Sequence, residues 1–155
     1  MQPVYVVFAG VNGAGKSTFY RTGLWRTEDM PRTMTRVNSD EIVVAQGGDP
    51  ASSADQLRAG REAVRLIEEC LSRRRSFNQE TTLTGHAVLR NMSRAREAGY
   101  RVVLYYIGVD TAAVALDRIA HRVAVGGHDI DEGAVLRRYR ASLGNLSRAL
   151  DLCDE

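Results

Sequence analysis

The chain has 155 residues, 44% of them hydrophobic, and a formal net charge of +2, which predicts one globular domain spanning 1–155. The near-balanced charge gives no general attraction to nucleic acid or membranes, and no apolar stretch reaches the roughly 20 residues that span a bilayer, so neither is an expected partner. The two cysteines are too few for a disulfide scaffold, which favours a reducing, cytoplasmic location.

The N-terminal segment joins a strand to a glycine-rich loop. Residues 4–9 are apolar at consecutive positions, which is typical of a strand buried on both faces of a parallel sheet rather than of a signal peptide. Residues 10–17 read Gly-Val-Asn-Gly-Ala-Gly-Lys-Ser and fill every position of the phosphate-binding pattern G-x-x-x-x-G-K-[ST]. A helix is predicted to follow, from about 15 to 23. A chance glycine-rich turn is the alternative, and the complete motif in its strand–loop–helix context argues against it.

The residue types in this loop suit ATP with Mg²⁺. Glycines let successive backbone N–H groups converge on phosphate oxygens. Lys16 would reach the β- and γ-phosphates, and the Ser17 hydroxyl would ligate Mg²⁺. Because Lys16 is the only lysine, the chain cannot contain the guanine-recognition motif Asn-Lys-x-Asp, which argues against a Ras-like GTPase. The predicted nucleotide-binding residues are Gly10, Asn12, Gly13, Ala14, Gly15, Lys16, Ser17 and Thr18.

The rest of the chain alternates strands with helices. Strands are predicted at 33–38, 76–83 and 100–108, and helices at 53–75, 86–98, 111–125 and from about 131 onward. The first of these helices is expected to open at a capping box over 53–56 and to turn its apolar positions Leu57, Val64, Ile67 and Leu71 inward. The last is expected to break near Gly144 and Asn145. The alternation predicts an α/β protein with a three-layer P-loop NTPase/kinase fold and a mainly parallel sheet.

Polar residues follow two of these strands, and ligands bind at the carboxyl ends of strands in such a sheet. Asp40 is well placed to orient an attacking hydroxyl and accept its proton, although Asp40 or Ser39 could instead cap a short helix. Glu80 and Thr82 lie at the end of a strand that should otherwise be apolar. A carboxylate there is costly unless it binds metal-coordinated water or a substrate hydroxyl, or is paired internally, and we favour function.

Arginines bracket the sequence Gly126-Gly127-His128. A glycine-hinged segment flanked by arginines is typical of a lid that brings positive charge onto a transferring phosphoryl group. Any single one of these arginines is expected to pair with a carboxylate on the surface. For the set as a whole, we expect at least one arginine to contact phosphate. His128 is expected to be a lid-loop contact rather than a metal ligand. The arginines are Arg118, Arg122, Arg137, Arg138 and Arg140.

Taken in order, G-x-N-G-A-G-K-S-T, V-N-S-D-E-I, S-F-N-Q-E-T-T-L-T-G and R-V-A-V-G-G-H-D-I resemble the zeta-toxin family of P-loop kinases, in its compact bacterial branch. The resemblance implies transfer of a phosphoryl group from ATP, with Mg²⁺, to UDP-N-acetylglucosamine or a related sugar nucleotide. It also implies an antitoxin protein as a partner. By resemblance Asp40 is the catalytic base, and Glu80 and Thr82 bind substrate. The family's remaining catalytic positions correspond to Lys16, to Arg118 or Arg122, and to Arg137 or Arg138.

The end of the sequence departs from this family, whose members continue into another strand after D-L-x-D. We therefore expect the sheet to lack its last strand, which would make residues 102–107 an edge. An unpaired apolar edge invites pairing, so we expect the C-terminal helix or a partner to cover it. The departure also keeps an alternative function open: a nucleotide-binding toxin remnant or regulatory module with little catalysis, which binds an antitoxin-like partner.

Overall fold

Strands and helices alternate along the chain. The computed structural model describes residues 2–127 and 129–155. Its strands are β1 (Val4–Ala9), β2 (Thr35–Val37), β3 (Phe77–Thr81) and β4 (Arg101–Tyr106). Its helices are α1 (Lys16–Thr22), α2 (Ser39–Ala45), α3 (Ser53–Ser72), α4 (His86–Glu97), α5 (Ala112–Ala124) and α6 (Glu132–Leu150). None of the helices in the described residues is both long and apolar enough to cross a membrane.

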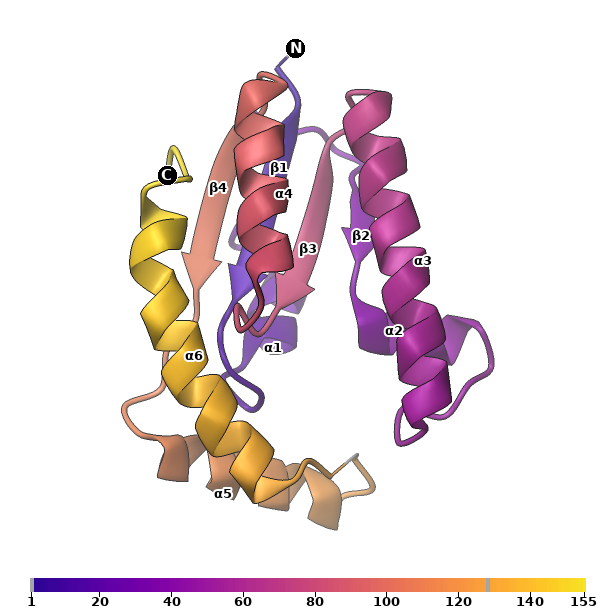
Figure 1. The fold of residues 1–155 in the computed structure, drawn as a ribbon, viewed down its shortest axis with the longest axis vertical. Helices are drawn as coiled ribbons and strands as arrows, with labels where there is room; N and C mark the ends of the chain where they lie inside the picture. Colours follow the sequence, from indigo (N-terminus) through magenta and orange to yellow (C-terminus); the bar gives the residue numbers. More distant parts are fainter. Residues whose placement is uncertain (1, 128) are drawn as a thin grey trace.

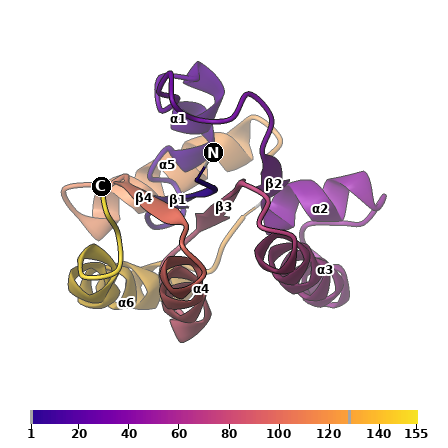
Figure 2. The ribbon, with the colours of Figure 1, turned by 90° about the horizontal axis from the view of Figure 1, so that it is seen from above.

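The strands form one parallel sheet in the order β2-β3-β1-β4, so their carboxyl ends share one edge (Figure 1). Helix α1 lies on one face of the sheet, and α3, α4 and α6 lie on the other (Figure 2). Helix α5 lies beyond the carboxyl ends of the strands. This arrangement confirms the predicted α/β fold with a parallel sheet.

Strand β1 is the centre of the core, and all six of its residues are buried. Its alternate side chains enter two different apolar clusters, because successive residues of a strand point to opposite faces. Tyr5 and Val7 pack with residues of α3 and α4. On the opposite face Phe8 packs against Trp25, with ring centroids 5.1 Å apart, and the Trp25 indole N–H donates to the Tyr20 carbonyl at 2.8 Å.

Helix α3 buries only half of its predicted apolar positions: Ile67 and Leu71 are buried as expected. Leu57 and Val64 are 60% and 59% exposed, so the expectation that they turn inward is wrong. The cap also lies one residue earlier than predicted, because the Ser52 hydroxyl accepts from the Asp55 N–H. The side chains that α3 buries are smaller on average: Ala59, Ala63, Ile67, Cys70 and Leu71.

Helix α6 runs without interruption from Glu132 to Leu150, so the predicted break near Gly144 and Asn145 is wrong. The reason is that the buried Asn145 side chain donates across the fold to the Leu83 carbonyl at 3.0 Å, instead of competing for the backbone of its own helix. One turn earlier, the buried Ser142 hydroxyl bonds the Tyr106 hydroxyl at 3.0 Å.

Replacing Asn145 by alanine should lower the free energy of unfolding by about 1–3 kcal/mol, because it leaves the Leu83 carbonyl without its buried donor. Urea denaturation measures the change. Ser147→Ala, at an exposed position on the same helix, is the matched control and should stay within about 0.5 kcal/mol of the unmodified protein. Equal midpoints for the two variants would contradict the assigned role of Asn145.

The outer edge of β4 is met by the residues that follow α6. The Asp154 N–H donates to the Val102 carbonyl at 2.8 Å, and the Leu104 N–H donates to the Glu155 carbonyl at 2.9 Å. The Asp154 carboxylate accepts from the Val102 N–H at 2.8 Å. The expected cover is the C-terminal helix or a partner; in the structure the segment that follows this helix, residues 154–155, bonds the edge instead.

Candidate active site

The glycine-rich loop joins β1 to α1 and is in close contact with Ile107, after β4, and with Ala115 of α5. At Gly10, φ is +144° and an added Cβ would lie 2.3 Å from the Ile107 carbonyl oxygen. At Gly13, φ is +78° and a Cβ would lie 2.7 Å from the Ala115 carbonyl oxygen on α5. Both positions require glycine for conformation and for space. The loop therefore packs against Ile107, the residue after β4, and against α5.

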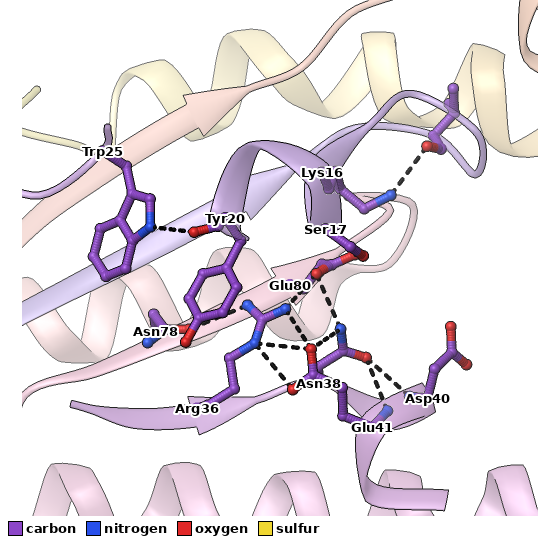
Figure 3. Close-up of polar contacts among 11 residues, drawn as sticks. Lys16, Ser17, Tyr20, Trp25, Arg36, Asn38, Asp40, Glu41, Asn78 and Glu80 are labelled. Carbon is purple, nitrogen blue, oxygen red and sulfur yellow. Dashed lines mark hydrogen bonds and ion pairs between the residues drawn. The ribbon is translucent and has the colours of Figure 1, made fainter. Parts of the chain in front are cut away.

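Lys16 and Ser17 begin α1 at the mouth of this loop. The Lys16 ammonium is buried and donates to the Val11 carbonyl at 3.0 Å, while the Ser17 hydroxyl donates to Glu80 Oε1 at 2.8 Å (Figure 3). Glu80 lies at the carboxyl end of β3, beside Phe8 of β1 in the sheet register. The predicted phosphate-binding residues and the predicted polar strand end are thus adjacent.

Four charged side chains act on the Lys16 ammonium. Burial lowers its pKa, and the carboxylates of Glu80 and Asp40 oppose that shift. The guanidinium groups of Arg122 and Arg138 lower the pKa further. Residues far apart in the sequence therefore act electrostatically on one ammonium group.

A cavity of about 370 Å³ lies at the carboxyl ends of the strands. It brings together predicted site residues from the glycine-rich loop, α2, β3 and α6. These are Asn12, Lys16, Asp40, Glu80, Thr82 and Arg138. A larger cavity of about 950 Å³ shares Asn12, Asp40, Gln56 and Arg138 with the first and continues between α3 and α6. Exposed Leu57 and Val44 also line it.

Asp40 is exposed in the first turn of α2 and does not cap that helix. The cap is Asn38, whose side-chain oxygen accepts from the backbone N–H groups of Asp40 and Glu41 at 3.0 and 3.3 Å. The alternative prediction that Asp40 or Ser39 caps this helix is therefore wrong. Asp40 Oδ1 instead accepts from the Gln56 amide at 3.0 Å. Gln56, on α3, is a site residue that the sequence did not indicate.

The arginines divide into those near the loop and those away from it. Arg118 donates to the Ala14 carbonyl at 3.2 Å, and Arg138 donates to the Asn12 side-chain oxygen at 2.9 Å. Arg122 lines the larger cavity. Arg137 is exposed on α6 and lines neither cavity. His128 lies outside the described residues.

Glu80 is held by partners from two other elements. Its Oε2 accepts from Arg36 of β2 at 2.5 Å and from Asn38 at 3.0 Å. Arg36 is not indicated by the sequence, because it belongs to a strand of only three residues. Asn38 belongs to the motif V-N-S-D-E-I, but the sequence does not indicate its contact with Glu80.

The loop that carries a parallel strand into a helix beginning with Lys16 and Ser17 defines a P-loop domain, and the layers around it are those of the P-loop kinase fold. The family model AAA_33, described as an AAA domain, matches residues 6–146. The chain therefore belongs to the AAA_33 family.

Three known proteins are similar to this chain over most of its length. An uncharacterized protein of Haemophilus influenzae is 34% identical over 139 residues, which cover 90% of this chain and 94% of that protein. A chain in the structure of the Pnkp1/Rnl/Hen1 RNA repair complex is similar over 95% of this chain, with a TM-score of 0.72 and 21% identity. A chain of the PezAT toxin–antitoxin system of Streptococcus pneumoniae is similar over 99%, with a TM-score of 0.69 and 17% identity. This chain spans 46% and 65% of those two structures, and the likeness shows the fold.

Proposed function

We propose that the protein is a kinase that transfers the γ-phosphoryl group of ATP to a hydroxyl of a small molecule. The observation that carries this proposal is that Lys16 of the P-loop and Asp40 of α2 line the same cavity. A phosphotransferase needs a cation against the phosphates and a carboxylate near the attacking hydroxyl. The shared cavity offers both at one edge of the sheet.

The residues present fit Mg²⁺, since the Ser17 hydroxyl and the Glu80 carboxylate are oxygen donors 2.8 Å apart. Magnesium is commonly bound through one or two such groups plus substrate phosphates. When bound, Mg²⁺ supplies charge neutralisation to the phosphates. In this proposal Ser17 ligates the ion, and Glu80 contacts it directly or through a coordinated water.

The remaining residues bind and orient. Backbone N–H groups of residues 10–18 and the Lys16 ammonium bind the phosphates, after Lys16 gives up its bond to the Val11 carbonyl. Arg118, Arg122 and Arg138 supply positive charge from the other side.

Asp40 performs the proton chemistry in this proposal. It accepts the proton of the acceptor hydroxyl while the acceptor oxygen bonds the γ-phosphorus and the bond to the β-phosphate oxygen breaks, releasing ADP. The Gln56 amide, 3.0 Å from Asp40 Oδ1, keeps the carboxylate turned toward the cavity.

For the acceptor we propose UDP-N-acetylglucosamine, or a related sugar nucleotide, on the strength of the zeta-toxin resemblance. The larger cavity, about 950 Å³, is at the upper end of the range for small-molecule sites and has room for such a molecule. Glu80 and Thr82 would bind it from the adjoining cavity.

The test is incubation of the purified protein with ATP, Mg²⁺ and a panel of acceptors, with the mass of each acceptor measured afterwards. The panel contains UDP-N-acetylglucosamine, UDP-glucose, free N-acetylglucosamine and gluconate. Gain of one phosphoryl group by an acceptor supports the kinase. No transfer to any acceptor, together with tight binding of an antitoxin-like protein, would overturn it in favour of the regulatory module.

A further inference from the structure

Arg36 is a nearly buried cation in an edge strand. It occupies the middle of β2, and its side chain is 14% exposed. Its guanidinium lies 3.7 Å from the centroid of the Tyr20 ring on α1 (Figure 3). Removing a charge from water is unfavourable unless the charge is paired, so the buried guanidinium of Arg36 requires acceptors for its N–H groups.

The guanidinium has acceptors on two neighbouring elements. Its Nη2 donates to Glu80 Oε2 at 2.5 Å and to Glu41 Oε1 at 2.9 Å. Its Nη1 donates to the Asn78 side-chain oxygen at 3.2 Å. With the Tyr20 stack, Arg36 thus connects its own strand with α1, α2 and β3. These three elements carry Ser17, Asp40 and Glu80.

These contacts give the Glu80 carboxylate a fixed direction. Oε2 is occupied by Arg36 and by Asn38, whose amide donates at 3.0 Å. Oε1 is left facing the Ser17 hydroxyl. A carboxylate held at one oxygen by charge-assisted hydrogen bonds has little freedom to rotate. Glu80 Oε1 is therefore held toward the mouth of the P-loop.

We propose that Arg36 is a positioning residue that holds Glu80 Oε1 against the Ser17 site at which Mg²⁺ would accompany ATP. The inference rests on the proposed function, because it concerns the metal side of the same site. Arg36 acts through Glu80 and touches no substrate. Loss of Arg36 leaves Glu80 free to turn away from Ser17 and weakens the contribution of Mg²⁺ to ATP binding.

Arginine suits this position better than lysine. A planar guanidinium can lie flat on the Tyr20 ring and still direct its N–H groups toward Glu41, Glu80 and Asn78. A lysine ammonium would supply the charge without the planar stack or the fork of donors. Arg36→Lys should therefore restore only part of the effect.

The test measures ATP affinity by calorimetry with and without Mg²⁺, in the full chain and its variants. The ratio of the two affinities is the gain due to Mg²⁺. Arg36→Met should reduce that gain by about 10-fold or more, as for other residues that support a metal ligand, and Arg36→Lys by an intermediate factor. Affinity without Mg²⁺ should change little. The control is Arg101→Met, which removes a similarly shielded arginine, 21% exposed, that is paired with Asp29 outside both cavities.

A double-variant cycle tests whether Arg36 acts through Glu80. Glu80→Gln alone should reduce the Mg²⁺ gain, and Arg36→Met added to it should have little further effect. Independent, additive losses would overturn the inference, as would an unchanged gain in Arg36→Met. If Arg36→Met does not fold, an unchanged gain in Arg36→Lys overturns it. Failure of the unmodified protein to bind ATP at all is a different result, which overturns the proposed function together with the inference.

Discussion

Replacing Lys16 by methionine should reduce phosphoryl transfer from ATP by about 100-fold or more, the effect typical of removing one preorganised group that stabilises developing charge. Lys16 is the only cationic residue of the glycine-rich motif, residues 10–17, and its ammonium is already shielded from water. Methionine keeps an unbranched side chain of nearly the same length and removes the charge together with the N–H donors, one of which bonds the Val11 carbonyl. The measurement is initial rate against ATP concentration, with UDP-N-acetylglucosamine as acceptor.

The control for this substitution is Arg21→Met, which removes an exposed cation from the last turn of the same helix. It should leave the rate within a factor of about two, as expected for a surface change away from the site. If Lys16→Met retained both ATP affinity and turnover, the loop would not be a phosphate-binding site, and the proposed reaction would fall with it.

Replacing Asp40 by asparagine should reduce kcat by about 10²–10⁴-fold, the range for loss of a general base, while ATP affinity stays the same. Asparagine keeps the shape and can still accept from Gln56, so the geometry of the cavity should persist. The negative charge and the capacity to take a proton are lost. Single-turnover rates and equilibrium ATP binding, measured on the same preparations, separate the two quantities.

Asp117→Asn, at an exposed position of α5, provides the matched control for Asp40 and should behave like the unmodified protein. Two results would contradict the assignment. Full turnover in Asp40→Asn would place the base elsewhere, and an equal fall in ATP affinity would show that Asp40 serves nucleotide binding rather than proton transfer.

Much of the fold could be predicted from the sequence because its signals are local and strong. Consecutive apolar residues mark β1, and the complete glycine motif determines how β1 turns into α1. The errors arise where tertiary contacts outweigh local preference. Asn145 reads as a helix breaker until its amide is seen to bond the Leu83 carbonyl. Leu57 reads as core, yet it lines a cavity.

The residues of the candidate site also divide into those that the sequence predicts and those that it does not. Lys16, Asp40 and Glu80 follow from motifs and from the rule that ligands bind at the carboxyl ends of parallel strands, and the structure brings all three to one cavity. Arg36 and Gln56 could not be predicted. Each acts on a residue of another element, and a short edge strand or a helix surface gives no local signal of such a contact.

The buried ammonium of Lys16 at the start of α1 allows ligand binding at the P-loop to be detected without an added label. Because the chain contains a single lysine, acylating reagents have one side-chain target besides the N-terminal amine, and a lysine-specific protease has one cleavage point, the bond from Lys16 to Ser17. Slow cutting of that bond in the native protein measures how often the mouth of the loop opens. A molecule that occupies the mouth would be detected as protection, with no label and no knowledge of its chemistry.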